Sequence, residues 1–180
     1  MNPEKSRKNE IREVKNYSSN LIENNPFYKS ERLYLYYYDG RYKKLKDGII
    51  DITKNKTTDN AALTISADTG TDMARKTFYS GSVIYSDMLI RFSFLNLYNT
   101  LEEDLLYIFN PMECRNFTEG LLCGISSSDL MPCAFKCIVS LTPVENKENL
   151  KKSLMISKEE LDRWQHLNMM VVDNKPRIFY

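Results

Sequence analysis

The sequence predicts a mainly β protein: an antiparallel β-barrel, closed or nearly closed, of about eight strands. The first observation is residues 78–94, in which two extended halves flank Ser86 and Asp87. In the second half, large apolar residues alternate with Arg91 and Ser93, which is the period-two pattern of a strand with one buried face. The second observation is that similar runs, rich in β-branched and aromatic residues, lie on both sides. We therefore expect a central hairpin with further strands added to it.

An N-terminal helix is expected before the barrel, over residues 4–24. Its narrow apolar stripe consists of Ile11, Val14, Leu21 and Ile22. Pro26 ends the helix, because proline disfavours helical geometry in the residue before it. Such a helix suits a lid over the barrel or a contact with a second copy of the chain. We divide the chain into this helix, residues 1–26, and a barrel domain, residues 27–180.

The strands follow in order along the chain. We expect them at residues 32–38, 44–54, 61–67, 78–85, 88–94, 105–109, 118–126 and 133–141. Asp39 and Gly40 suit a turn with positive φ after the first strand. Gly120 and Gly124 weaken a regular strand but suit a sharp bend or a close approach of another backbone.

The C-terminal part is expected to be a charged linker followed by a short helix. The linker spans residues 144–152. Ser157 can cap the helix while Glu160 reaches back to it, so we place a helix from there through Leu167. Residues 169–180 are candidates for a last strand.

Length, composition and charge favour a single globular domain and disfavour duplex DNA and membranes as partners. With 180 residues and a hydrophobic share of 42%, the chain is long and apolar enough for one domain with a core. A net charge of +1 does not favour duplex DNA as a partner. The sequence has no apolar run of membrane-spanning length, and its polar start lacks the core of a secretion signal. We therefore expect a cytoplasmic protein without a membrane partner.

Residues that would carry catalysis or hold a metal are scarce. Four cysteines occur without a Cys-x-x-Cys pair, so buried free thiols are favoured over a zinc site. His166 is the only histidine, and Ser126 to Ser128 lack the Gly-x-Ser-x-Gly context of a nucleophile. We expect no enzyme, no catalytic residue, no metal and no cofactor; an unrecognised hydrolase or nuclease is the third functional alternative.

Binding residues are easier to nominate. Tyr34, Tyr36 and Tyr38 share one face of the first strand, where they form either a half-buried packing surface or the wall of a ligand cavity. Arg91 and Lys136 fall opposite the apolar faces of their strands, and Arg177 lies near the closing strand. Such groups are either solvated outside the barrel or placed inside it against an anion. The candidate ligand-binding residues are Tyr34, Tyr36, Tyr38, Arg91, Lys136 and Arg177, with the tyrosines and the basic groups expected inside.

Two segments carry a family resemblance. Residues 34–52, and residues 120–141 with their Gly-Ile-Ser-Ser-Ser-Asp-x-x-Pro turn, resemble bacterial calycin-like β-barrel sensor domains. Such domains follow helix-turn-helix regions in regulators and occur in anti-phage effectors that recognise cyclic nucleotides. The resemblance implies a sensor for a small anionic ligand such as a nucleotide, although the chain has neither a complete helix-turn-helix nor a membrane segment. The alternative is a protein-interaction or homodimerisation module that assembles through the N-terminal helix.

Overall fold

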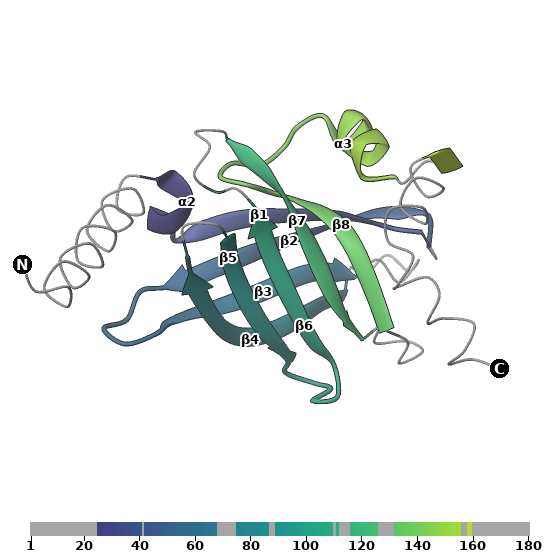
Figure 1. The fold of residues 1–180 in the computed structure, drawn as a ribbon. Helices are drawn as coiled ribbons and strands as arrows, with labels where there is room; N and C mark the ends of the chain where they lie inside the picture. The colour runs from purple at the N-terminus through teal and green to yellow at the C-terminus, as the bar shows by residue number, and fades with distance from the viewer. Residues whose placement is uncertain are drawn as a thin grey trace, which may run out of the picture.

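Eight antiparallel strands close into a barrel in the computed structural model, which describes residues 25–40, 42–67, 75–86, 89–109, 111, 116–125, 132–155 and 158–159. Each strand pairs with the next, and β8 pairs with β1 to complete the ring (Figure 1). The strands are β1 (Arg32–Asp39), β2 (Lys44–Thr53), β3 (Asp59–Ala67), β4 (Arg75–Tyr85), β5 (Leu89–Asn96), β6 (Glu103–Phe109), β7 (Phe117–Ile125) and β8 (Pro132–Ser140). The expected mainly β, closed barrel is confirmed.

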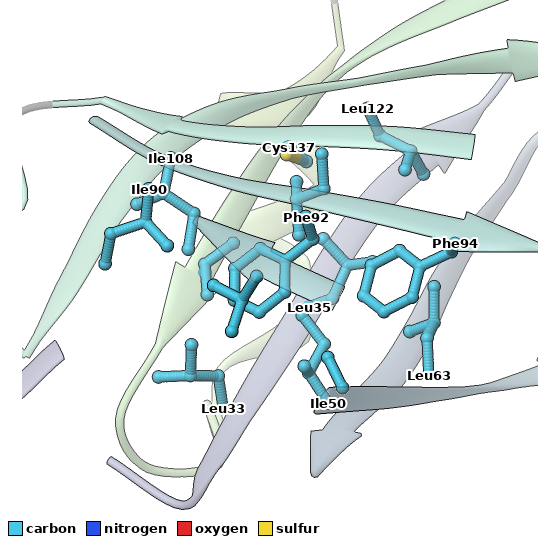
Figure 2. Close-up of a cluster of buried hydrophobic side chains, with 14 of the residues drawn as sticks. Leu33, Leu35, Ile50, Leu63, Ile90, Phe92, Phe94, Ile108, Leu122 and Cys137 are labelled. Carbon is cyan, nitrogen blue, oxygen red and sulfur yellow. The ribbon is translucent and has the colours of Figure 1, made fainter. Parts of the chain in front are cut away.

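Side chains that alternate between the two faces of the strands, most regularly in β5 and β6, fill the barrel interior. In β5, Phe92 and Phe94 are fully buried while Arg91 between them is exposed. The two phenylalanine rings stack with 5.6 Å between their centroids. Around them, Figure 2 shows side chains from several strands meeting in one cluster, among them Leu35 and Ile50, both fully buried. Burial of these apolar side chains is the main source of the stability of the fold.

A short helix, α2 (Pro26–Lys29), closes one end of the barrel. Phe27 is fully buried in the core, and Tyr28 is only 5% exposed. The Asn25 side chain accepts a hydrogen bond from the Phe27 N–H at 2.9 Å and donates one to the Pro111 carbonyl. The Lys54 ammonium donates to the Tyr28 carbonyl at 2.9 Å. This end is therefore sealed by packing and by polar contacts to two loops.

A second helix, α3 (Lys147–Leu154), packs against the outside of the barrel at β1 and β8 (Figure 1). Its buried residues Leu150 and Leu154 lie in a cluster with Tyr36 and Ile138. Asn146 caps the helix by accepting a hydrogen bond from the N–H three residues later, at 3.1 Å. The expectation of a linker over residues 144–152 was wrong, because this cap and two leucines on one face favour a helix.

Several expectations fall on residues that the structure does not describe. The helix expected over residues 4–24 lies outside the described residues, as does the strand expected within residues 169–180. Of the helix expected to start at Ser157, only residues 158–159 are described, and they are helical. In the part of the chain that is described, no helix is long and apolar enough to cross a membrane.

The glycines of β7 allow close approach, as expected. A Cβ on Gly120 would lie 2.5 Å from the Tyr107 carbonyl oxygen, and one on Gly124 would lie 1.8 Å from Oδ1 of Asp104. The turn after β1 differs from the expectation. Positive φ occurs at Lys43, at 52°, and not at Gly40.

Candidate functional site

The three tyrosines of β1 lie on the outer face of the barrel. Tyr36 is buried against α3, and Tyr34 and Tyr38 pack beside it. The Val144 N–H donates a hydrogen bond to the Tyr36 hydroxyl at 3.0 Å. The expectation that these rings line the interior was wrong, because the alternate residues of β1 take the inner face. Those inner residues are Leu33, Leu35 and Tyr37.

The predicted basic residues do not enter the barrel either. Arg91 is exposed on β5, because its neighbour Phe92 occupies the inner face. Lys136 alternates in the same way with buried Cys137 and lies 3.9 Å from the Glu119 carboxylate. Arg177 lies outside the described residues. The expectation of basic groups inside was therefore wrong for both described residues, whereas their part in binding stays a prediction.

A surface groove lies between the β1–β2 turn and α3, with a volume of about 340 Å³. We call it the lysine groove. Its lining residues are Lys43, Lys44, Leu45, Asp47, Lys147, Glu148 and Lys151. Four lysines face two carboxylates here, so the groove carries a positive charge at neutral pH.

The groove borders the tyrosine face. The Lys151 ammonium lies 5.7 Å from the centroid of the Tyr38 ring. On the other side, the Lys147 ammonium lies 3.3 Å from the Asp47 carboxylate and links α3 to β2. The position of Lys147 and Lys151 depends on α3, which is held by its leucines against Tyr36. Two of the tyrosines predicted to bind ligand therefore lie next to the groove: Tyr36 packs against α3, and Tyr38 lies beside Lys151.

Sequence reasoning missed the lysines of this groove. The contributing segments lie about a hundred residues apart, as in the pair of Asp47 and Lys147. A signal did exist in the second segment. Asn146 is a favourable N-cap, and the spacing of four residues places Lys147 and Lys151 on one helical face. Their meeting with Lys43 required the closure of β1 against β8, which no local pattern encodes.

The inner end of the barrel away from α2 is polar and acidic. Glu102 is 4% exposed and accepts hydrogen bonds from the Tyr79 hydroxyl at 2.8 Å and from the Asn96 side-chain amide at 2.6 Å. Asp104 lies beside it and is 7% exposed. Burial, and secondly the charge of Glu102, raise the pKa of Asp104 to about 7. Burial and the hydrogen bond to Glu102 raise the pKa of Tyr79 well above its usual range.

Three cysteines lie in the described part of the chain, and none of them forms a disulfide bond: Cys123, Cys133 and Cys137. Burial, with the nearby Cys123 second, raises the pKa of Cys137 to about 12, so this thiol is protonated and unreactive at neutral pH. Among the described residues, no group of three or more histidine, cysteine or acidic side chains could hold a metal ion.

No family model matches this chain, and neither a curated protein nor a solved structure matches it. The strand pairing defines the fold, and the groove and the acidic end are the two places where the described residues offer chemistry for binding.

Proposed function

We propose that this protein is a bacterial sensor that binds a small anionic ligand, namely a nucleotide signal of regulation or anti-phage defence, in the lysine groove. The observation that carries the proposal is the meeting of four lysines from two distant segments around one cavity. Lysine is a common phosphate ligand in proteins, acting as a mobile point charge. The resemblance of residues 34–52 to nucleotide-sensing barrels supports the same ligand class.

The size of the groove and its aromatic border fit a nucleotide. About 340 Å³ lies at the small end of the range for small-molecule sites. Tyr38 borders the groove beneath Lys151, and an aromatic ring next to ammonium groups suits a base stacked beside its own phosphate. The barrel interior offers less space for a ligand, because Phe92, Leu35 and their neighbours fill its middle section.

Backbone strain at the groove supports a binding role. Lys43 has φ of 52°, a left-handed conformation that costs a non-glycine residue about 1 kcal/mol or more. Such conformations persist only where the surrounding structure holds them in place, and they gather at active sites and ligand-binding sites. Lys43 lines the groove, so its conformation presents an ammonium group at the site of the proposed ligand.

The experiment is a calorimetric titration of the protein with a panel of mono-, di- and cyclic nucleotides. Lys151→Glu should weaken binding about tenfold or more, because it replaces an attracting charge with a repelling one. Lys152→Glu is the matched control: it makes the same change on the same helix, at an exposed residue that does not line the groove. Lys43→Asn removes a charge while keeping a residue that tolerates positive φ.

Binding of one nucleotide class that Lys151→Glu and Lys43→Asn weaken, and Lys152→Glu leaves largely intact, supports the proposal. No binding by any member of the panel, or equal losses with Lys151→Glu and Lys152→Glu, would overturn it.

A second candidate function, a protein-interaction module, is favoured by the exposed turn between β5 and β6. Leu97, Tyr98 and Leu101 are 60, 78 and 68% exposed. Three large apolar side chains on one turn are a common feature of protein contacts. A mass that rises with concentration, and falls when Leu97 and Leu101 become serine, would favour this function. Deletion of residues 1–24 tests separately whether the helix expected there mediates assembly.

A further inference from the structure

Two buried carboxylates at the acidic end of the barrel form no ion pair with any described residue. Glu102 and Asp104 are 4 and 7% exposed. Buried charges in proteins are normally paired, because leaving water costs them several kcal/mol.

The two carboxylates differ in their hydrogen bonds. Glu102 has both oxygens occupied, by the Tyr79 hydroxyl and the Asn96 amide. Asp104 accepts no hydrogen bond from any side chain or backbone group of the described residues. No fully enclosed side-chain oxygen of these residues lacks a partner, so the Asp104 carboxylate must reach solvent.

The chain holds the Asp104 carboxylate inside the barrel at a defined place. Its Oδ1 lies where a Cβ would stand on Gly124, at a separation of 1.8 Å. Any other residue at this position of β7 would collide with the carboxylate. The pairing of Asp104 with both Phe94 and Gly124 places it on the inner face of β6.

Two lysines of β2, Lys44 and Lys46, pair with the inward-facing Asp39 and Tyr37 of β1 and have other contacts. The Lys46 ammonium lies 5.7 Å from the centroid of the Tyr42 ring, and Lys44 lines the lysine groove. Aromatic rings stand on the inner side: Tyr37 pairs with Phe135 at 5.0 Å between centroids. Tyr37 lies close enough to Asp104 for their charges to interact. Burial is the main cause that raises the pKa of Tyr37, and the negative charge of Asp104 is the second.

We propose that this end of the barrel binds a small organic cation with a primary ammonium group, which donates a hydrogen bond to Asp104. The ammonium supplies the donor and the positive charge that Asp104 and Glu102 lack, and aromatic rings favour cations of this kind. An organic cation fits better than a divalent metal, because the described residues offer one free carboxylate and no cluster of three metal ligands.

Binding of the cation is coupled to pH. The ammonium requires ionised Asp104, whose pKa burial raises to about 7. The described titratable or charged groups that face this end are Tyr37, Asp39, Lys44, Lys46, Tyr79, Glu102 and Cys133. Affinity should therefore rise as pH increases from 6 to 8.

The test uses n-butylammonium chloride as the probe and follows the melting temperature of the whole chain at pH 8. The controls are n-butanol, which is neutral, and sodium and magnesium chloride at matched ionic strength. Asp104→Asn removes the charge with little change of shape. Glu103→Gln is the matched control variant, because it makes the same change on the exposed face of the same strand.

Butylammonium should raise the melting temperature of the original chain and of Glu103→Gln, whereas none of the control solutes should. In Asp104→Asn, the affinity for butylammonium, taken from the dependence of the melting temperature on its concentration, should be about tenfold or more lower. An equal rise in Asp104→Asn, an equal rise with magnesium or n-butanol, or no rise in the original chain would each overturn the proposal.

Discussion

The Tyr79 hydroxyl donates a hydrogen bond of 2.8 Å to the Glu102 carboxylate, joining β4 to the turn before β6 inside the barrel. The two residues are 5 and 4% exposed, so water has little access to either. This contact organises the acidic end, because the other oxygen of Glu102 is held by Asn96. The same Asn96 accepts hydrogen bonds from the N–H groups of Tyr98 and Asn99 and thereby shapes the turn.

Replacing Tyr79 by phenylalanine should lower the free energy of unfolding by about 1–3 kcal/mol. The change removes the donor and leaves one oxygen of a buried carboxylate unpaired. Urea denaturation measures the loss. Tyr98→Phe serves as the control, because Tyr98 is 78% exposed and its replacement should change stability by less than about 0.5 kcal/mol. Equal effects of the two replacements would contradict the prediction.

Replacing Gly124 by alanine should destabilise the barrel by about 2 kcal/mol or more. The new Cβ would stand 1.8 Å from Oδ1 of Asp104 and 2.6 Å from the Glu103 carbonyl, and the backbone oxygen cannot move aside easily. Gly40→Ala is the control, because nothing lies within 4 Å of a Cβ there. Thermal denaturation of both variants measures the difference. A Gly124→Ala protein as stable as the original chain would show that Asp104 and Glu103 do not approach Gly124 this closely.

Asp104 should make the protein less stable as pH rises. The carboxyl ionises near pH 4 when unfolded and near 7 when folded, so the folded state holds more protons between these values. The free energy of unfolding therefore falls from about pH 4 to about 7, by at most about 4 kcal/mol. Asp104→Asn should remove this fall, whereas Glu103→Gln should keep it. Urea denaturation of the three proteins at pH 5 and pH 8 gives the comparison.

Replacing Tyr36 by phenylalanine should loosen α3 rather than the barrel. The Val144 N–H loses the hydroxyl that accepts its hydrogen bond at 3.0 Å, at a cost of about 1 kcal/mol. Hydrogen exchange should become faster at Val144 and in α3, and remain slow in β5. Tyr107→Phe on the outer face of β6 is the control. Faster exchange throughout the barrel would show that α3 is not a separate unit.

The barrel could be predicted because its signal is local. Alternation such as that of Phe92 and Arg91 assigns strands and faces, and eight consecutive antiparallel strands need only short turns. The inner or outer placement of the β1 tyrosines could not be predicted from that strand, since Leu35 and Tyr36 suit either side. In the structure, the outer face of β1 is covered by α3, whose leucines pack against Tyr36.

The two candidate sites were less predictable than the fold. The lysine groove joins Lys43 to Lys151 across the sequence, and only the packed position of α3 brings them together. At the acidic end, the run Glu102-Glu103-Asp104 predicts a solvated, charged surface from the sequence alone. Their burial follows from the start of β6 at Glu103, which turns Asp104 inward beside Gly124.

The most direct test of the account is to map anion binding by ¹H–¹⁵N chemical shifts, with cyclic AMP and pyrophosphate as probes. If the ligand site lies on the outside of the barrel, the amides of Lys43, Lys44, Lys147 and Lys151 should shift together and saturably, while those of Phe92 and Leu106 stay in place. Shifts centred on Phe92 and Leu106, or no saturable shift at the four lysines with either probe, would contradict an anion site in the lysine groove.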